Sequence, residues 1–483
     1  MNNNVIVALD QGSSGTRVFA VDGSGAVLYK RAETLAPAHP QEGYAQYNAE
    51  ELLESQIPLL NEMLDKLEEE EVSAIAVSSQ RSTVVLWNRR TGKALAPVLS
   101  WQDGRATQEA QGVLTPQQDI HRLTGLYKTP FYSAPKIAWC LKHIPAVRRA
   151  AKAGDLAVGP VATYLIWHLT KGAVFAVDPT LAQRTLLYNI HTGDWDEDLL
   201  NAFGINRACL PEIRPTAGDY GLYEYRERRI PILVCVGDQQ AFMAGMGLHA
   251  GSSSINYGTG AFFLHNAGKE LKQIPGILTS VSASGTNGKC DFILEGPVNA
   301  CGVAFDWLKQ LGFTFEMDEL DDLCAQAQRP VWFLPALGGL GAPYWDFNAS
   351  AVLAGFSPQT KRADMVAGVL RGVAFLVADI AYYIKNYGVD LGPITVAGGL
   401  ANHAALLQFQ ADILQTDLYK SPETESTVMG AAYLAAQALN IDTSAWALFQ
   451  KGQAVKPAIK PEDAELLNRQ WRNFLEWSRT QKK

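Results

Sequence analysis

Short apolar segments rich in β-branched residues alternate with turn signals at the start of the chain. Residues 5–9 form the first segment, and residues 18–21 and 26–28 follow, separated by the polar, glycine-containing residues 22–25. Apolar runs of this length bounded by glycine are typical of buried strands, and a glycine-rich turn between two runs favours a hairpin. We therefore predict that the chain opens with a β-hairpin or meander.

Three later apolar runs lead directly into polar or glycine-rich loops. The runs are residues 74–77, 232–236 and 394–397. The loops that follow them are residues 78–81, 237–240 and 398–399. Because α/β sheets place ligand sites at the ends of their strands, these loops are expected to carry binding residues.

Helical periodicity appears in three stretches. Apolar residues between Leu53 and Leu67 recur at helical spacing and predict an amphipathic helix, although Pro58 lies within it and proline normally kinks or ends a helix. Residues 365–387 predict a long helix closed by Gly388, and residues 464–478 predict a surface helix. No short repeat and no low-complexity linker interrupts the chain, so two lobes packed together are expected.

Composition narrows the classes of protein. A length of 483 residues suggests about two or three domains. Apolar residues make up 47% and charged residues 19%, which excludes a disordered chain. With 41 basic against 49 acidic residues, the net charge of −8 argues against nucleic-acid or polybasic membrane partners.

The sequence predicts a reduced, cytosolic protein. The first residues lack the basic and apolar regions of a secretory signal, and the uncharged run at residues 156–167 is too short to span a membrane. The six cysteines form no CxxC pair, which favours buried thiols over metal or redox sites.

Residues 10–17, read as Asp-Gln-Gly-Ser-Ser-Gly-Thr-Arg, form a candidate phosphate loop after the first strand. Glycine lets the backbone approach a polyphosphate, Ser, Thr and Arg supply donors, and an acid at the strand end can hold magnesium. The segment is not a Walker loop, because no Gly-Lys-Ser/Thr follows at the required spacing. A purely structural turn is the alternative.

Several further motifs occur in a fixed order with this octapeptide. They are residues 79–81, 101–102, 184–192, 237–240, 257–260, 294–296, 341–346, 398–399 and 408–413. Together they resemble the FGGY family of carbohydrate kinases, and within it the glycerol kinase branch is the most similar. The resemblance covers about residues 5–460.

The resemblance implies an α/β fold with two lobes, the actin-like ATPase architecture in which a ribonuclease H-like fold is duplicated around a cleft. Residues 1–246 would form the N-terminal lobe, with the acceptor site, the catalytic base and the first phosphate loop. Residues 247–460 would form the C-terminal, nucleotide-binding lobe, and residues 461–483 a C-terminal helix.

The resemblance also implies site residues and the cofactors ATP and Mg²⁺. Asp238 corresponds to the family's catalytic base, although an aspartate there can also simply cap a helix. Gln239 would bond a substrate hydroxyl, and Asp10 would hold Mg²⁺. The expected ATP contacts are Ser13, Ser14, Arg17, Thr259, Gly260, Gly302, Asp306, Gly399 and His403, the last where relatives have Asn or Ser.

The acceptor pocket departs from the branch. Arg81 matches a glycerol-contacting arginine, but Ser82 replaces a glutamate and Phe131 replaces a tyrosine. Trp101 and Phe262 remain and can sandwich a carbon chain. Losing two hydrogen-bonding groups is expected to redirect specificity away from glycerol, unless Tyr132 takes the place of the missing phenol.

The sequence therefore predicts an ATP-dependent kinase that phosphorylates a hydroxyl of a short sugar or polyol. Glycerol kinase proper is the first alternative, and an actin-like ATPase without a small-molecule acceptor is the second. A member that has lost catalysis is disfavoured by the retained Asp10, Arg17, Asp238 and Thr259. The expected partner is the sugar or polyol substrate, without nucleic acid or membrane, and a homodimer is left open.

Overall fold

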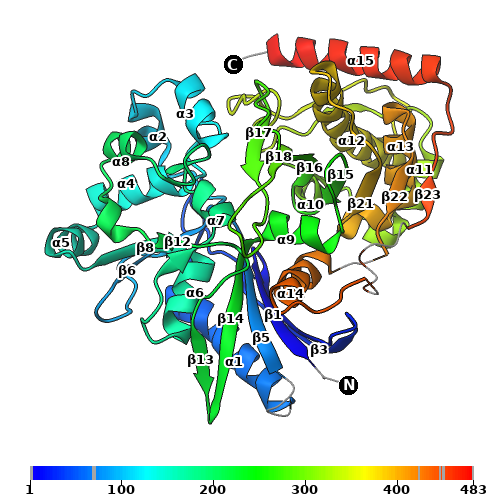
Figure 1. Ribbon diagram of the computed structural model, residues 1–483. Helices are drawn as coiled ribbons and strands as arrows, with labels where there is room; N and C mark the ends of the chain where they lie inside the picture. The colour runs from blue at the N-terminus through cyan, green and yellow to red at the C-terminus, as the bar shows by residue number, and fades with distance from the viewer. Residues whose placement is uncertain are drawn as a thin grey trace. The chain divides into compact units, whose positions relative to one another are not determined.

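The computed structural model describes residues 4–67, 72–422, 425–444, 446, 448 and 452–480 (Figure 1). Contacts between residues divide the chain into two compact units. Unit 1 comprises Met1–Gly247, Ser280–Phe292 and Glu425–Phe449. Unit 2 comprises Leu248–Thr279, Ile293–Thr424 and Gln450–Lys483.

This division differs from the predicted one, which placed everything from residue 247 to residue 460 in one lobe. The change at Gly247 lies next to the predicted boundary, but two later segments return to unit 1. The larger of them contains helix α14 (Ser426–Ala438), whose buried apolar side chains pack on the sheet of unit 1. Hydrophobic contact thus assigns this helix to unit 1, and linear motif order could not show that.

Unit 1 is built on a six-stranded sheet with the order β13-β14-β5-β1-β2-β3. The strands are β13 (Leu222–Tyr225), β14 (Arg228–Gly237), β5 (Val72–Ser79), β1 (Val5–Gly12), β2 (Gly15–Val21) and β3 (Val27–Thr34). β1, β2 and β3 pair antiparallel, which confirms the predicted opening meander. β14, β5 and β1 run parallel, with Gly237 level with Ser79 and Ser79 level with Gln11. Three polar loops therefore leave the sheet side by side.

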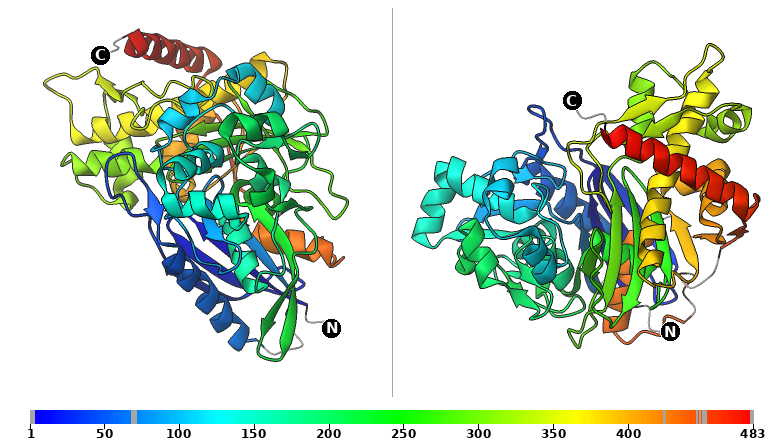
Figure 2. Two further views of the ribbon diagram at one scale, coloured as in Figure 1. Left: turned by 90° about the vertical axis from the view of Figure 1, so that its left-hand side faces the viewer. Right: turned by 90° about the horizontal axis from the view of Figure 1, so that it is seen from above.

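Two helices cover opposite faces of this sheet, as Figure 2 shows for α1 in blue and α14 in orange. Ile6 and Ala8 face α14, whereas Gln11 faces α1 (Ala49–Asp65) and accepts a hydrogen bond from the Gln56 amide. The predicted amphipathic helix is confirmed as α1, which does not end at Pro58, and Pro58 lies on its exposed side.

The rest of unit 1 packs beside this sheet. A four-stranded sheet has the order β4 (Gln46–Tyr47), β7 (Val98–Leu99), β6 (Val84–Asn88), β8 (Leu156–Pro160). Two short pairs are β9 (Ala176–Val177) with β12 (Glu212–Ile213), and β10 (Tyr188–Asn189) with β11 (Asp194–Trp195). The helices are α2 (Thr107–Gly112), α3 (Gln117–Thr124), α4 (Ser133–His143), α5 (Pro145–Ala153), α6 (Val161–Leu169), α7 (Pro179–Gln183), α8 (Glu197–Phe203) and α9 (Asp238–Gly245).

Unit 2 is built on a seven-stranded sheet with the order β17-β18-β16-β15-β21-β22-β23. The strands are β17 (Leu278–Val281), β18 (Phe292–Val298), β16 (Ala261–Gly268), β15 (Ser253–Tyr257), β21 (Ile394–Ala397), β22 (Leu418–Lys420) and β23 (Ala454–Val455). The end of β17 and the first residue of β18 fall in the segment Ser280–Phe292 of unit 1. A separate pair is β19 (Trp332–Leu334) with β20 (Val352–Ala354). The helices are α10 (Gly302–Gln310), α11 (Leu320–Gln326), α12 (Arg362–Asn386), α13 (Ala404–Leu414) and α15 (Pro461–Thr480).

The two large sheets share a strand pattern. In unit 1 the antiparallel pair β1–β2 lies beside the parallel strands β5 and β14. In unit 2 the antiparallel pair β15–β16 lies beside the parallel strands β21 and β22. The tight turn between the first two strands therefore occupies the same place in each sheet, and each turn holds one of the predicted phosphate-binding segments.

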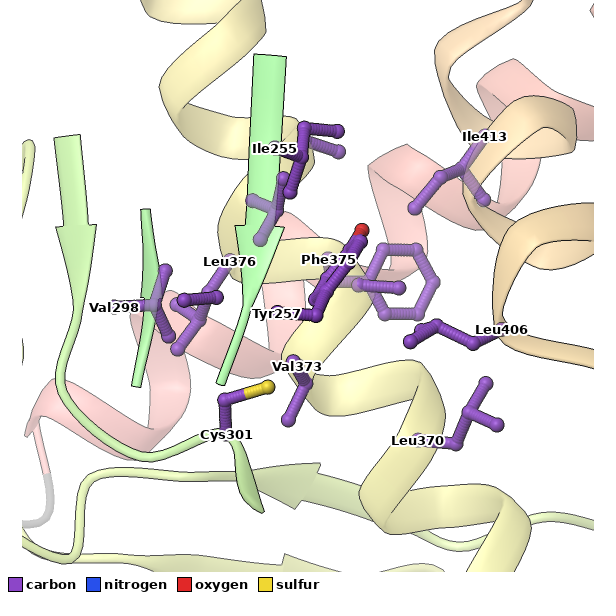
Figure 3. Close-up of a cluster of buried hydrophobic side chains, with 14 of the residues drawn as sticks. Ile255, Tyr257, Val298, Cys301, Leu370, Val373, Phe375, Leu376, Leu406 and Ile413 are labelled. Atoms are coloured by element: carbon purple, nitrogen blue, oxygen red, sulfur yellow. The ribbon is translucent and has the colours of Figure 1, made fainter. Parts of the chain in front are cut away.

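Helix α12 organises the core of unit 2. Figure 3 shows its side chains Leu370, Val373, Phe375 and Leu376 among apolar residues of β15, β18 and α13. Its length and composition match a membrane span, but 83% of its most apolar stretch is buried inside the unit. The apolar character of α12 is thus explained by its position in a core.

The C-terminal helix α15 closes one side of this core, next to α12 (Figure 1). Trp471 is 1% exposed, and its ring stacks on Phe375 with the centroids 4.9 Å apart. Its indole nitrogen donates to Asp379 Oδ2 at 2.7 Å, and burial raises the pKa of that carboxyl to about 6. One side chain thus supplies both apolar contact and a partner for a buried acid.

We expect Trp471→Ala to lower the free energy of unfolding of unit 2 by about 3–5 kcal/mol, because it opens a cavity and removes a donor from Asp379. Urea unfolding followed by near-UV circular dichroism would measure the change. Trp477→Ala on the same helix is the control, since Trp477 is 48% exposed and its removal should cost about 0.5 kcal/mol or less. Equal losses in the two variants would contradict the assignment.

Candidate active site

The loop after β1 is held in place by two aromatic side chains. The Tyr47 hydroxyl donates to the Ser13 carbonyl oxygen, and the Trp101 indole nitrogen donates to Ser13 Oγ, both at 2.7 Å. The loop turns tightly, since a Cβ at Gly15 would come within 2.1 Å of the Glu33 carbonyl oxygen. Ser13 and Trp101, predicted for phosphate and acceptor respectively, are therefore in direct contact.

Asp10, Arg17 and Glu425 form a chain of ion pairs on the side of the sheet that faces α14. Strand alternation places Asp10 on the same face as Ile6 and Ala8, and Arg17 lies directly opposite it on β2. An Arg17 guanidinium nitrogen lies 3.5 Å from Asp10 Oδ2, and another donates to Glu425 Oε2 at 2.6 Å.

The Asp10 carboxyl is 2% exposed, and burial raises its pKa to about 6. The nearby carboxylates of Asp238 and Glu425 add to the rise, and Arg17 opposes it. Its Oδ1 accepts no hydrogen bond from any residue that the structure describes. Burying a carboxylate oxygen without a hydrogen bond lowers the stability of the fold, and a bound cation would compensate for this.

A close approach between two helices fixes the position of Glu425. Gly245 of α9 lies against the Ser426 carbonyl oxygen, and Gly430 of α14 lies against that of Ala241; an added Cβ would come within 1.8 Å of either oxygen. Only glycine fits at such a crossing. α14 is thereby locked to the helix that begins with Asp238.

Asp238 begins α9 at the end of β14 and pairs with Arg81 at the end of β5. The Arg81 Nε lies 3.2 Å from Asp238 Oδ1, and the Gln239 backbone amide donates to the same oxygen at 2.8 Å. Asp238 is 27% exposed while Arg81 is 7% exposed. The Asp238 carboxylate therefore reaches solvent, and the buried Arg81 guanidinium contacts it from the protein interior. The Gln240 side chain accepts a hydrogen bond from the Arg81 guanidinium at 3.5 Å and donates one to the Val281 carbonyl oxygen at 2.9 Å.

A buried hydrogen-bond network lies beneath Asp238. The backbone amide of Gly237 donates to Thr180 Oγ1 at 2.8 Å. Thr180 Oγ1 donates in turn to Asp178, which also accepts from the Thr216 hydroxyl. Burial raises the pKa of Asp178 to about 6, against the effect of these hydrogen bonds. The strand end that carries Asp238 is therefore fixed from below.

The residues around Asp10 fit a magnesium ion that binds mainly through phosphate. The described residues include no group of three His, Cys, Asp or Glu side chains that could hold a metal ion. Mg²⁺ commonly uses one or two carboxylates and completes its shell with water and substrate phosphates. The unused Oδ1 of Asp10 meets that requirement.

In unit 2, the turn between β15 and β16 packs against the start of α10. The Gly302 amide donates to the Gly258 carbonyl oxygen at 3.0 Å, and the Cys301 amide donates to the Thr259 carbonyl oxygen at 3.1 Å. A Cβ at Gly260 would come within 2.9 Å of the Val298 carbonyl oxygen. The predicted contacts Thr259, Gly260 and Gly302 are therefore brought together.

The remaining predicted nucleotide residues follow β21 or lie on α10. Gly398 has φ +94°, and a Cβ there would meet the Tyr257 carbonyl oxygen at 2.4 Å, so glycine is required between the two parallel strands. No atom lies within 4 Å of a Cβ built on Gly399. Asp306 is exposed on α10, and His403 precedes α13 without a side-chain capping bond.

The predicted acceptor residues are divided between the two units. Ser82 is 8% exposed and has φ +64°, and Phe131 is half-buried near Gly104. Tyr132, the proposed substitute for the missing phenol, is buried. Phe262 lies half-buried on β16 of unit 2.

Sequence reasoning did not identify several supporting residues. Glu425 lies far from Arg17 in the chain, and Asp178 lies 59 positions before Gly237, so no local spacing connects them. Tyr47 was part of no motif. Only the unusual crossing glycines Gly245 and Gly430 could have hinted that α9 and α14 touch.

Comparison with known proteins identifies the kinase family. Residues 5–245 match the N-terminal domain, and residues 253–439 the C-terminal domain, of the FGGY family of carbohydrate kinases. A glycerol kinase from Thermus brockianus is 36% identical over 488 residues, covering 98% of each chain. A glycerol kinase from Shewanella frigidimarina is 36% identical over 454 residues, covering 90% of this chain and 89% of its own.

Solved structures support the fold. Glycerol kinase from Plasmodium falciparum, crystallised with ADP, superposes with a TM-score of 0.90 at 28% identity and covers 99% of this chain and 98% of its own. Gluconate kinase from Lactobacillus acidophilus superposes with a TM-score of 0.87 at 21% identity, with the same coverage. The predicted two-domain α/β fold of the actin-like ATPase class is confirmed.

We expect Asp10→Asn to stabilise the ligand-free protein, more at pH 8 than at pH 5. The raised pKa means that folding favours the protonated acid, so this contribution is present below pH 3.8 and is lost as pH rises through about 6. The full penalty is about 3 kcal/mol at pH 8 and about half of that at pH 5.

Thermal melting of both proteins at pH 5 and pH 8, without nucleotide or metal, would measure the difference. Asp306→Asn, on the exposed side of α10, is the control and should show the pH dependence of the parent protein. An Asp10→Asn gain that is equal at both pH values would contradict the raised pKa.

Proposed function

Because the chain belongs to the FGGY family of carbohydrate kinases, we propose that it transfers the γ-phosphate of ATP to a hydroxyl of a short sugar or polyol, with Asp238 as general base. The contact between Asp238 and Arg81 at the ends of two parallel strands carries this proposal. A carboxylate held by a buried guanidinium, yet open to solvent, suits the removal of a proton from a bound alcohol.

Phosphoryl transfer depends mostly on positioning and on neutralising phosphate charge. Arg81 and the Gln239 amide fix the Asp238 carboxylate, and the Gln239 side chain orients the acceptor hydroxyl. Arg17 holds the transferring phosphate, exchanging part of its contact with Glu425 for phosphate oxygens. Magnesium, held by Asp10, would neutralise phosphate charge when bound.

Residues of both units are proposed for ATP. In unit 1 these are Ser13, Ser14 and Arg17. In unit 2 they are Thr259, Gly260, Gly302, Asp306, Gly399 and His403, and the clustering of the first three around the β15–β16 turn supports a second phosphate contact there. A cytosolic location remains a prediction, and a homodimer remains open.

We expect Asp238→Asn to lower kcat by about a hundredfold or more, because the amide cannot accept the hydroxyl proton. ATP affinity, measured by isothermal titration calorimetry, should stay close to that of the parent protein. A coupled assay for ADP with Mg-ATP and a panel of polyols and sugars would measure turnover. Activity that survives the substitution would move the base elsewhere.

The panel also separates the kinase from an ATPase without an acceptor. ADP release that depends on one polyol or sugar supports the kinase. ADP release that is independent of every acceptor in the panel would support the ATPase, and the proposed function would fail.

Glycerol itself is the second candidate acceptor, supported by the full-length similarity to glycerol kinases. Ser82 and Phe131 speak against it, because they remove a carboxylate and a phenol from the predicted pocket. We therefore favour another short polyol or a sugar.

We expect Ser82→Glu combined with Phe131→Tyr to raise kcat/KM for glycerol about tenfold or more relative to the preferred acceptor, because polar partners for glycerol are restored. Ser82→Gln with Phe131→Tyr is the control, of similar size but without the added charge. The ratio of the two kcat/KM values in the coupled assay measures the switch. An unchanged ratio would show that these positions do not select the acceptor.

A further inference from the structure

A buried lysine lies directly behind the loops that carry the proposed acceptor residues. Lys136, in the first turn of α4, is 0% exposed. Its ammonium donates to the backbone carbonyl oxygen of Ser100 at 2.6 Å and to that of Ser82 at 3.1 Å. Removing an ammonium from water costs free energy, so hydrogen bonds or ion pairs must compensate for the burial of this lysine.

The two carbonyl groups belong to residues next to the proposed acceptor contacts. Ser82 follows Arg81, whose guanidinium pairs with Asp238. Ser100 precedes Trp101, whose backbone amide and indole nitrogen are both hydrogen-bonded. One ammonium therefore joins two loops that are 18 residues apart in the chain and that both end at the proposed site.

The backbone at Ser82 needs such support. Its φ of +64° lies in the left-handed region, which is unfavourable for a residue other than glycine unless the surroundings hold it. The Ser133 hydroxyl, also in the first turn of α4, donates to the same Ser82 carbonyl oxygen at 3.2 Å. Two side chains of one helix turn thus fix one strained peptide.

The charged groups around Lys136 do not form an ion pair with it in the described part of the chain. Burial lowers the pKa of its ammonium to about 7, Asp103 and Cys140 oppose this, and Arg105 adds to it. Asp103 already pairs with Arg105 at 2.7 Å, and no carboxylate lies within ion-pair distance of Lys136 in the described part of the chain. The ammonium therefore serves the two carbonyl oxygens.

We propose that Lys136 is a positioning residue for acceptor binding, because its ammonium fixes the Ser82 and Ser100 carbonyl groups and thereby orients Arg81 and Trp101 toward the substrate. This inference rests on the proposed kinase function. It assigns the start of α4 a part in acceptor recognition, although the lysine itself never touches the substrate.

The test compares Lys136→Met with Ser133→Ala. Methionine keeps the length of the lysine but removes every donor, and we expect kcat/KM for the acceptor to fall about ten- to a hundredfold, mainly through KM. Ser133→Ala removes one donor from the Ser82 carbonyl and should cause a smaller loss of the same kind, about two- to fivefold. The dissociation constant of ATP, measured by calorimetry, should change less than about twofold in both variants.

Lys142→Met is the matched control, because Lys142 is an exposed lysine on the same helix whose side chain, among the described residues, pairs only with Glu109. It should leave both constants unchanged. If Lys136→Met does not fold, Ser133→Ala decides the question. Folded variants with lower melting temperatures but an unchanged KM for the acceptor overturn the positioning role. Wild-type protein that phosphorylates no acceptor overturns the proposed function instead, and this inference with it.

Discussion

The parallel register of β14, β5 and β1 is the constraint on which the proposed active site depends. Because Gly237, Ser79 and Gln11 are level across three adjacent strands, the residues around these positions are brought to one edge of the sheet. Asp10 belongs to the first strand, Arg81 follows the second, and Asp238 follows the third. A shift of two residues between β5 and β14 would separate the pair formed by Arg81 and Asp238, and a shift of β1 would move Asp10 away from them.

This edge gathers charge that the fold must balance. Asp10 is held with a raised pKa, because it is buried and faces two further carboxylates, while Arg17 compensates in part. The same logic applies to Asp178 beneath Gly237, which is buried and surrounded by hydroxyl and amide donors. The negative charges of these carboxylates are thus balanced by neighbouring donors. A positive overall charge is not needed for this, and the net charge of the chain is −8. The site gives up some stability for chemistry, as functional sites often do.

The supporting residues show how separate parts of unit 1 act on one site. α14 returns from late in the chain, is locked to α9 by Gly245 and Gly430, and delivers Glu425 to Arg17. α4 delivers Lys136 and Ser133 to the loops behind Arg81 and Trp101. Both helices are packing elements that also hold polar groups in place, so the proposed acceptor site would depend on core packing.

The strands, the long helices, the family and the loops that carry Asp10, Arg81 and Asp238 could all be predicted from the sequence, because periodicity and motif order can be read along the chain. It could not show that α1 continues past Pro58, which lies on the exposed side of the helix while the opposite side is held by packing. The tertiary structure was needed to show that α14 belongs to unit 1, that Glu425 contacts Arg17, and that Lys136 contacts the Ser82 and Ser100 carbonyl oxygens. These contacts join residues far apart in the chain, and no local pattern encodes such distances.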